Sequence, residues 1–316
     1  MSVTIRLADP EQDYDAAASL ISQYQNQAIT GNDIREWDEE RLEGMIRRRT
    51  VAVTEAGQVV GCSTMLHESW DPPGKFYVWL CVDAAATQQG IGSHLYDDAL
   101  AFCQAHGASQ FSSQVNDNDS DSQAFAQRRG FRQDRHIFDS VIHLADFDET
   151  PFAPITPAVL AQGIRILSLA DVGNTPDMRR QLYEVNRATA LDIPGSTGIF
   201  STYEEFSQIV FYSGWFKPAG QILALDGDKA IGMAAVRFLG ETGTMYNLMT
   251  GVLPEYRGRN IALALKLHTI RLARAWGAIA IRTNNDSQNG PMLAINRKLG
   301  YQPEPGYFTL VKEPIQ

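Results

Sequence analysis

The stretch "VLPEYRGRNIA", residues 252–262, joins a strand-like segment to an amphipathic helical pattern that begins at Ile261. The joint contains two arginines, a glycine and an asparagine: Arg257, Gly258, Arg259 and Asn260. It is either an ordinary polar turn or a loop that holds an anion against the first turn of the helix. The second interpretation has a physical basis, because N–H groups at a helix amino terminus lack intrahelical partners and carry partial positive charge.

A related joint, "VDAAATQQGIG", occupies residues 82–92, which is 252 − 82 = 170 residues earlier. The glycines that close the following helical patterns, Gly107 in "AHGA" and Gly277 in "AWGA", have the same separation. So do Gly130 in "RRGF" and Gly300 in "KLGY". One offset over about fifty residues indicates that the second half of the chain is a diverged copy of the first.

The bulk properties are those of a globular chain with room for two cores. Its 316 residues exceed the usual size of one hydrophobic core, so we expect two domains. A formal net charge of -10 argues against a nucleic-acid partner, because phosphate binding needs clustered Lys and Arg. Three cysteines without CxxC or metal-ligand spacing predict neither a disulfide framework nor a metal site. With no leader-like or long apolar segment, we expect a cytoplasmic protein that does not engage a membrane.

Each copy predicts the same order of elements from hydrophobic periodicity and glycine-containing turns. In the first copy we expect a strand at 3–8, helices near 12–27 and 36–48, a hairpin turning at Ala56–Gly57, a strand at 75–82, a helix at 91–106, a strand at 110–115 and a helix near 120–129. In the second we expect a strand at 164–169, helices near 177–188 and 203–211, a hairpin turning at Asp226–Gly227, strands at 244–252 and 278–284 around a helix at 261–276, a helix near 291–299 and a strand at 307–313.

Common nucleotide-binding motifs do not account for the two joints. A dinucleotide site needs GxGxxG within a βαβ unit, whereas a hairpin and two helices precede each joint. The sequence also lacks GxxxxGK[ST], which excludes a P-loop. In the first joint, Gly90 and Gly92 would let a phosphate approach the backbone, and in the second, Arg257 and Arg259 add formal charge. Asn260 tolerates the left-handed backbone better than most residues.

The predicted order of elements, with an (Arg or Gln)-x-x-Gly-x-(Gly or Ala) loop before the central helix, resembles the GNAT superfamily of acyl-CoA-dependent N-acyltransferases. In the second copy Arg257, Asn260 and Ala262 fill this pattern, with asparagine where glycine is usual. In the first copy the two glycines of "QQGIG" match, but Thr87 stands where Arg or Gln is expected. The resemblance spans nearly the whole chain and is to the tandem, mycothiol synthase-like type.

The resemblance implies a fold of the α/β (α+β) class with two tandem GNAT-like domains. Each domain would have a mixed, mostly antiparallel central sheet flanked by helices. We place the first domain at residues 1–145 and the second at 163–316. The segment 146–162 between them carries three prolines and no clear periodicity, and we predict that it is a linker.

The resemblance also implies acetyl-CoA (coenzyme A) as the cofactor. Its pyrophosphate would lie on the N–H groups of residues 258–262, and its pantetheine arm between strands 244–252 and 278–284, which should splay apart. A backbone N–H near Met249 or Gly251 would polarise the thioester carbonyl. Asn289 stands eleven residues before Gly300, as in the family's "N…GF" stretch, and Asp119 takes that place in the first copy. The implied cofactor-binding residues are Met249, Gly251, Val252, Arg257, Gly258, Arg259, Asn260, Ile261, Ala262, Asn284 and Asn289, and in the first domain Val82, Gln88, Gln89, Gly90, Ile91 and Gly92.

The general acid and base are less clear from the sequence. Many relatives use a tyrosine four residues before the glycine of the "GF" pair, but Asn296 and Ala126 occupy that place here. Three tyrosines are alternative acids, and each is otherwise a core or rim aromatic residue: Tyr246, Tyr301 and Tyr307. Asp286 is either a base or the cap of the next helix.

The family's acceptor pocket involves the connection between the first two helices of a domain. In the second copy Asp192 lies there, and it is either a ligand for a substrate ammonium or a turn residue before Pro194. We expect the second domain to be the catalytic one, because it has Arg257 and Asn289. The first has the acidic segment "NDNDSDS", residues 116–122, which would repel a phosphate-rich ligand.

The resulting prediction is an N-acetyltransferase that moves the acetyl group of acetyl-CoA to a small-molecule amine, in a monomer or homodimer. Two alternatives stay open at this point. One is a non-catalytic acyl-CoA-binding sensor or scaffold, suggested by the missing tyrosines. The other is an acetyltransferase that acts on protein amines.

Overall fold

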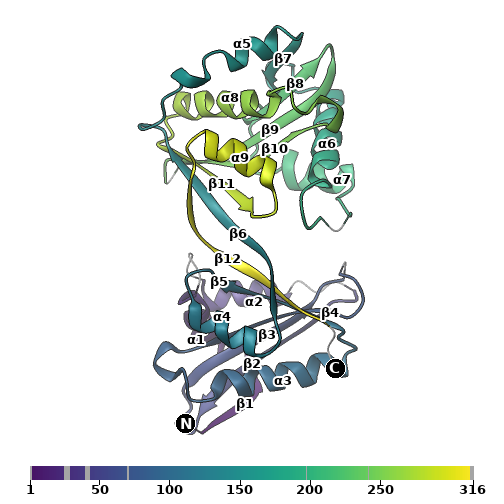
Figure 1. Cartoon of the computed structure of the whole chain (residues 1–316). Helices are drawn as coiled ribbons and strands as arrows, with labels where there is room; N and C mark the ends of the chain where they lie inside the picture. Colours follow the sequence, from purple (N-terminus) through teal and green to yellow (C-terminus); the bar gives the residue numbers. More distant parts are fainter. Residues whose placement is uncertain are drawn as a thin grey trace. The chain divides into compact units, whose positions relative to one another are not determined.

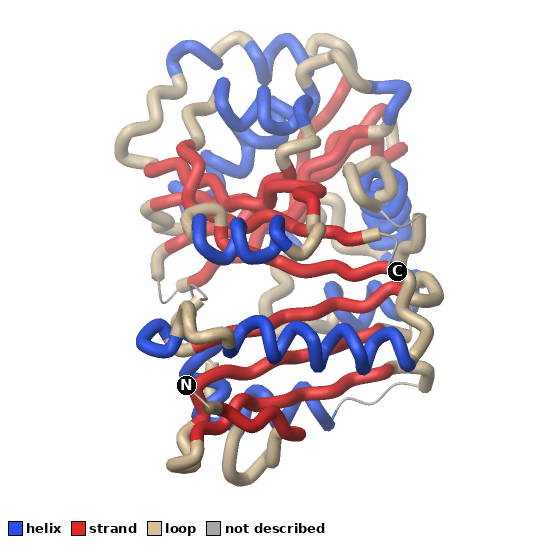
Figure 2. The backbone as a smooth tube through the Cα atoms, turned by 60° about the horizontal axis from the view of Figure 1, so that its bottom comes forward, coloured by secondary structure: helices blue, strands red, loops and turns tan. Residues whose placement is uncertain are grey.

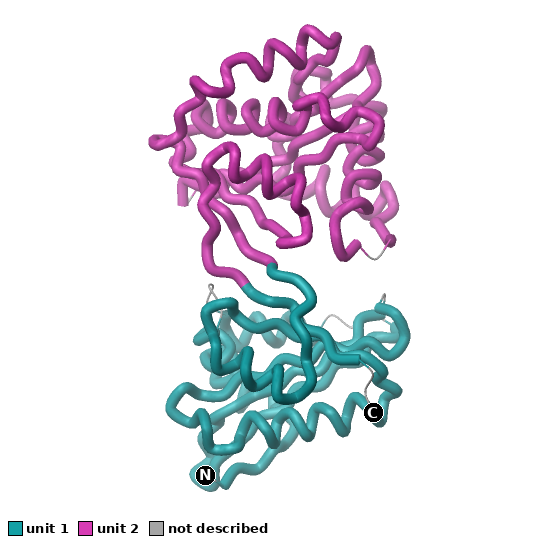
Figure 3. The backbone as a smooth tube through the Cα atoms, in the orientation of Figure 1, with its two compact units in different colours: residues 1–136, 307–316 teal, residues 137–306 magenta. Residues whose placement is uncertain are grey.

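The structure, a computed structural model, describes residues 2–24, 29–39, 43–69, 71–196, 198–240 and 242–313 (Figure 1). Strands form a sheet in each of two compact units, and helices lie against these strands (Figure 2). The first unit consists of residues 1–136 and 307–316, and the second of residues 137–306 (Figure 3). Within the described ranges, no helix combines the length and the apolar content that crossing a bilayer requires.

The first unit has the strand order β1-β2-β3-β4-β5-β12, in which β4 and β5 are parallel and the other neighbours antiparallel. Its elements are β1 (Val3–Leu7), α1 (Tyr14–Ser22), α2 (Gly31–Glu39), β2 (Ile46–Thr54), β3 (Val59–His67), β4 (Lys75–Val82), α3 (Ile91–Ala105), β5 (Gln110–Asn116), α4 (Ser120–Arg128) and residues 307–312 of β12 (Gln302–Lys312).

The second unit has the order β6-β11-β10-β9-β8-β7, in which β10 and β11 are the parallel pair. Its elements are residues 137–143 of β6 (Arg132–His143), α5 (Ile155–Leu160), β7 (Ile164–Ser168), α6 (Pro176–Ala190), α7 (Tyr203–Phe206), β8 (Gln221–Asp226), β9 (Lys229–Leu239), β10 (Thr244–Val252), α8 (Ile261–Ala275), β11 (Ala280–Asp286) and α9 (Gly290–Lys298). A π-helical turn at 207–211 continues α7.

Alternation along the strands of the second unit separates two apolar faces. Leu223 and Met233 pack against α6 and α7, on what we call the α6 face. Ile222 and Ile231 pack against α5 and α8, on what we call the α8 face. Helices therefore cover both faces of the sheet.

The predicted hairpins are confirmed, and their turns have the required backbone. Gly227 has positive φ in the two-residue turn between Asp226 and Lys229, and Gly57 has positive φ in the three-residue loop that Thr54 and Gln58 close. The predicted helix near 36–48 is displaced, because α2 ends at Glu39 and β2 begins at Ile46. The "RRR" run explains the strand: Arg47 and Arg49 project to one side and Arg48 to the other, which is the period of a strand. Residues 25–27 and 40–42 of the two predicted helices lie outside the described residues.

The compact units differ from the predicted ranges in three respects. Residues 137–145, predicted at the end of the first domain, are in the second unit, where residues 137–143 pair with β11. Residues 307–312 are in the first unit, because they pair with β5 and complete its sheet. The predicted linker at 146–162 is not a free segment, since it contains α5 and a short 3-10 turn. Phe152 and Val159 from it are buried in the core of the second unit. The segment has prolines and few buried apolar residues, so its sequence shows no clear hydrophobic periodicity although it packs against α8.

Candidate functional site

The parallel strands of the second unit part shortly after they meet, as the sequence predicted. They pair only at Thr244 with Ala280, Met245 with Ile281 and Tyr246 with Arg282. Immediately beyond this point β10 contains a bulge, because Asn247 is opposite Val236 whereas Met249 is opposite Ala235. Beyond this point the backbones of β10 and β11 no longer pair, and we call the gap between their unpaired ends the cleft. At its start, Thr283 Oγ1 on β11 donates to the Asn247 carbonyl on β10 (3.1 Å).

A buried polar network holds this bulge on the α8 face. The side-chain amide of Asn247 donates to the carbonyl groups of Ala235 (3.2 Å) and Met249 (2.8 Å). Its Oδ1 accepts from Thr250 Oγ1 (3.2 Å) and from Lys266 Nζ (3.0 Å). Lys266, on α8, is only 1% exposed, and burial lowers the pKa of its amine to about 7. A lysine in the middle of an apolar helix face gave no sequence signal of this role.

The loop after β10 has the backbone of an anion site. Gly258 and Asn260 both have positive φ, at 75° and 60°, and Asn260 is the residue that precedes the first turn of α8. The backbone N–H groups of residues 258–262 have no hydrogen-bond acceptor among the described residues. Asn260 thus takes the left-handed conformation expected for a residue at the glycine position of the pattern.

The two arginines of the loop contact neighbouring segments. Arg257 donates from Nε to the Val252 carbonyl (3.0 Å) and from its terminal nitrogen to Asp192 Oδ2 (2.5 Å). Arg259 donates to Gln162 Oε1 (2.8 Å). Arg257, expected to bind the cofactor, and Asp192, expected to bind the acceptor, thus form an ion pair. Both side chains are about half exposed, and such a pair contributes little stability, so a ligand of either residue could replace it.

A family model described as "Acetyltransferase (GNAT) family" matches residues 17–131 and 186–301. The chain belongs to this family. The two matches confirm the tandem GNAT duplication inferred from the 170-residue offset.

The mycothiol acetyltransferase of Pseudarthrobacter chlorophenolicus is 30% identical over 92 residues, or 28% of this chain and 28% of that protein. The chain therefore matches little more than a quarter of that relative's length. A GCN5-related N-acetyltransferase from Sphaerobacter thermophilus has a TM-score of 0.68 and 20% identity, over 99% of this chain and 96% of that one. A tandem GNAT protein from the clavulanic acid biosynthesis pathway has a TM-score of 0.67 and 20% identity, over 99% and 98%. These solved structures confirm the tandem GNAT fold.

Two predicted site residues of the second GNAT unit meet on the α6 face. Tyr246 OH donates to Asp139 Oδ1 (3.0 Å), and Asn284 Nδ2 donates to the same oxygen (3.0 Å). Asp139 lies on β6, directly opposite Asn284 on β11. The sequence did not indicate Asp139, because β6 precedes β11 by about 140 residues and nothing local predicts their pairing.

Other candidate catalytic residues lie elsewhere. Tyr301 is buried in the core on the α8 face, its hydroxyl has no partner among the described residues, and burial raises its pKa. Asn296, at the place of the family tyrosine, is buried and donates to Asn285 Oδ1 (2.7 Å). Asp286 is buried and accepts from the Gln288 N–H. Tyr307 belongs to the first unit, where it pairs with Asn116.

Asn289 and Gly251 have clear structural roles at the edges of the cleft. Asn289 caps α9 by accepting from the Met292 N–H (3.4 Å), and Asp119 caps α4 in the same way. A Cβ on Gly251 would lie 2.3 Å from Thr189 Oγ1, so glycine allows α6 to approach β10 closely.

The corresponding cleft of the first GNAT unit is bridged. There β4 and β5 pair only at their first three residues, from Lys75 with Gln110 to Tyr77 with Ser112. Tyr24 OH donates to the Val82 carbonyl on β4 (2.7 Å), and the Tyr24 carbonyl accepts from Asn116 Nδ2 on β5 (2.8 Å). The loop keeps its shape, with Gln88 and Gly90 in the left-handed region.

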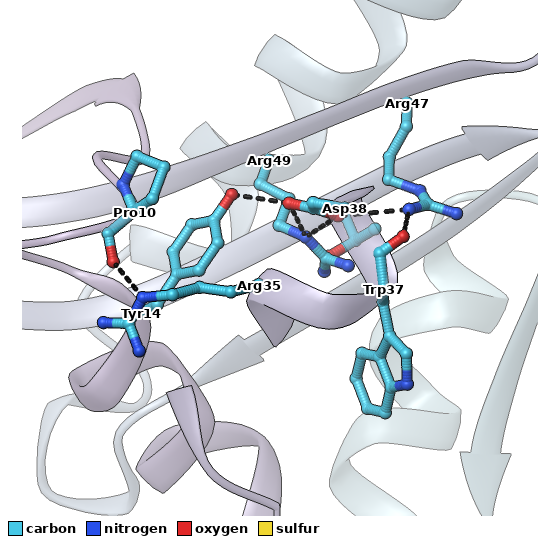
Figure 4. Close-up of polar contacts among 8 residues, drawn as sticks. Pro10, Tyr14, Arg35, Trp37, Asp38, Arg47 and Arg49 are labelled. Carbon is cyan, nitrogen blue, oxygen red and sulfur yellow. Dashed lines mark hydrogen bonds and ion pairs between the residues drawn. The ribbon is translucent and has the colours of Figure 1, made fainter. Parts of the chain in front are cut away.

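A second polar cluster in the first unit is structural. Asp38 at the end of α2 accepts from Tyr14 OH (2.5 Å) and Arg49 Nε (2.9 Å), and it pairs with Arg47 (3.3 Å) (Figure 4). Arg47 also donates to the Trp37 carbonyl. The cluster attaches α1 and α2 to β2, and desolvation with the Asp38 hydrogen bond raises the pKa of Tyr14 to about 12.

Proposed function

We propose that the second unit binds acetyl-CoA and transfers its acetyl group to a small-molecule primary amine by direct attack in a ternary complex. The observation that supports this most is the combination of parted strands β10 and β11 with a loop whose N–H groups have no acceptor in the described part of the chain. The first unit shares the loop conformation but has Tyr24 across its cleft.

The residues present fit the cofactor. The N–H groups of residues 258–262 and the charge of Arg257 and Arg259 suit a pyrophosphate. The β10 backbone beyond the bulge suits the amides of a pantetheine arm, and the N–H of Met249 or Gly251 suits a thioester carbonyl. When bound, acetyl-CoA supplies an acetyl group activated as a thioester.

The protein has three tasks in this reaction. It holds the acceptor against the cleft, removes a proton from the arriving ammonium, and supplies or admits a proton for the departing thiolate. An alkyl ammonium has a pKa near that of lysine, about 10.4, so the nitrogen needs this deprotonation before it can attack. Tyr246 is the retained candidate acid among the tyrosines, because Tyr301 is buried on the other face and Tyr307 lies in the first unit.

Calorimetry with acetyl-CoA, followed by a thiol-release assay over a panel of primary amines, tests the proposal. We expect one acetyl-CoA per chain and thiol release with at least one amine. Binding without thiol release over the panel would instead support an acyl-CoA sensor. The buried Asn296, at the position of the family's catalytic tyrosine, favours this alternative. Label transfer from acetyl-CoA to proteins would indicate a protein amine as the acceptor.

A further inference from the structure

The carboxylate of Asp139 is held in place by neutral donors and has one oxygen left over. Tyr246 OH and Asn284 Nδ2 both donate to the same oxygen, Oδ1, at 3.0 Å. Among the residues that the structure describes, Oδ2 has no hydrogen-bond donor and no ion-pair partner. The residue as a whole is partly exposed.

The place of Asp139 is as informative as its contacts. Tyr246 is the last residue of β10 that pairs with β11, so the cluster stands where the cleft opens. The cluster lies on the α6 face. Tyr246 is opposite Arg237, and Arg237 shares a face of β9 with Ala235 and Met233, which pack against α6. Met249, beyond the bulge, is on the same face. A strand advances about 3.3 Å per residue, so the Met249 backbone is within roughly 10 Å of Tyr246.

Other acids near the cleft are engaged. Asp192 is paired with Arg257 at 2.5 Å. Glu304 is paired with Arg282 at 2.7 Å. Asp286 is buried and accepts from a backbone N–H.

The positive groups on this face do not neutralise Asp139. Arg282, the neighbouring cation, is committed to Glu304. Arg237 is on β9, three strands away from β6, or about 14 Å at the usual strand spacing. Asp139 therefore has no ion-pair partner in the part of the chain that the structure describes.

We propose that Asp139 binds the cationic group of the acceptor, with Oδ2 accepting from a substrate ammonium while Tyr246 and Asn284 fix the carboxylate through Oδ1. This rests on the proposed function and assigns the acceptor to the class of alkyl amines that are protonated at neutral pH. Asp192, the acid that the sequence indicated for this role, instead pairs with the loop arginine. Charge-assisted hydrogen bonds of this kind are about twice as strong as neutral ones.

A binding experiment tests the cation site without requiring turnover. The full chain is saturated with coenzyme A and titrated with 1,4-diaminobutane in a calorimeter, for the wild type, Asp139→Asn and Asp228→Asn. Asp228 is the matched control, because it is a fully exposed acid at the β8–β9 turn of the same unit. We expect Asp139→Asn to weaken binding at least tenfold and Asp228→Asn to change it less than twofold. Equal binding by the wild type and Asp139→Asn, or no binding by the wild type, overturns the inference.

A second arm separates this inference from the proposed function. Thiol release from acetyl-CoA is measured with the same diamine, and Tyr246→Phe is added to remove one donor to Oδ1. We expect an increase in KM of tenfold or more for Asp139→Asn, with acetyl-CoA affinity within twofold of wild type. For Tyr246→Phe, which also removes the candidate acid, we expect about threefold in KM together with a lower kcat. If the wild type binds the diamine but releases no thiol with any amine of the panel, the transferase proposal fails and the cation site stands. If the wild type turns over and Asp139→Asn has an unchanged KM, the cation site fails and the transferase proposal stands.

Discussion

The parallel strand pairs β4–β5 and β10–β11 part in the same way but differ in the side chains at the point where they part. Each pair is hydrogen-bonded over three residues and then parts. In the first unit Tyr24 connects the parted strands through its hydroxyl and its carbonyl. In the second, a bulge held by Asn247 and Lys266 stands at the opening. Duplication preserved the scaffold, including a hydroxyl that joins the parted strands in each unit, Ser113 to the Val78 carbonyl and Thr283 to the Asn247 carbonyl. The units differ in the further bridge that Tyr24 makes in the first.

The two phosphate loops have the same backbone conformation although their residues differ. Positions 88 and 90 in the first unit, and 258 and 260 in the second, are all left-handed. Glycine occupies the second of these positions in one loop and the first in the other. Loop shape is therefore common to both units, whereas the arginines that add charge are present only in the second.

The largest expected effect concerns the approach of α6 to β10. Gly251 corresponds to Cys81 in the first unit, 170 residues earlier, and a Cβ at Gly251 would meet Thr189 at 2.3 Å. We expect Gly251→Cys to destabilise the second unit by about 3 kcal/mol, because Thr189 is branched at the contact and cannot move away. Hydrogen exchange of β9 and β10 peptides measures this, with Cys81→Gly as the counterpart. Unchanged protection in Gly251→Cys would show that the units pack their first helices alike.

The next effect is on pH dependence, through Lys266. Its pKa is lowered from 10.5 to about 7 by burial, and no charged neighbour contributes. Between these values the unfolded chain binds one proton more than the folded chain, so this group adds stability as the pH rises. We expect Lys266→Met to stabilise the second unit by about 2 kcal/mol at pH 6, with a gain that shrinks towards pH 10.

Denaturant titration of the exchange of β10 peptides at several pH values measures the Lys266 effect. Lys229→Met is the control, because Lys229 is mostly exposed. A gain that is the same at pH 6 and pH 10 would mean that Lys266 stays charged in the folded protein. The first unit has Tyr96 at the corresponding position and should lack this dependence on lysine.

A smaller effect distinguishes the two loops. Arg257→Glu should weaken acetyl-CoA binding about tenfold or ~1.4 kcal/mol, since it replaces a cation at the pyrophosphate by an anion. Thr87→Glu, the same change at the corresponding position of the first loop, should alter the affinity less than twofold. Calorimetry with both variants decides between the loops. Equal losses would assign the cofactor to both units.

The smallest expected effect concerns the bridge that Tyr24 makes between β4 and β5 of the first unit. Tyr24→Phe removes one hydrogen bond, to the Val82 carbonyl, and should cost about 1 kcal/mol. The stoichiometry of acetyl-CoA should stay at one per chain, because the first loop has no arginine. Hydrogen exchange near Val82 and calorimetric stoichiometry report the two effects. A second bound acetyl-CoA would show that Tyr24 alone keeps the first cleft closed.

The sequence by itself determined the duplication, the GNAT resemblance, the hairpins and the loop of residues 257–262. These features depend on residues close together in the chain, or on a comparison of its two halves at one offset. Hydrophobic period, glycine at turns and polar residues before a helix are local signals, and they need no knowledge of which strands meet.

Only the tertiary structure decided which side chains lie beside the parted strands of each unit. Asp139 meets Tyr246 across 107 positions, and Asn116 reaches Tyr24 across 92, so neither pair has a local signature. Lys266 resembles an ordinary helix residue until β10 is packed against it. The pairing of residues 307–312 with β5 likewise depends on which sheet edge is free. Such contacts form between segments far apart in sequence, and their free energies come from geometry that no window of the sequence contains.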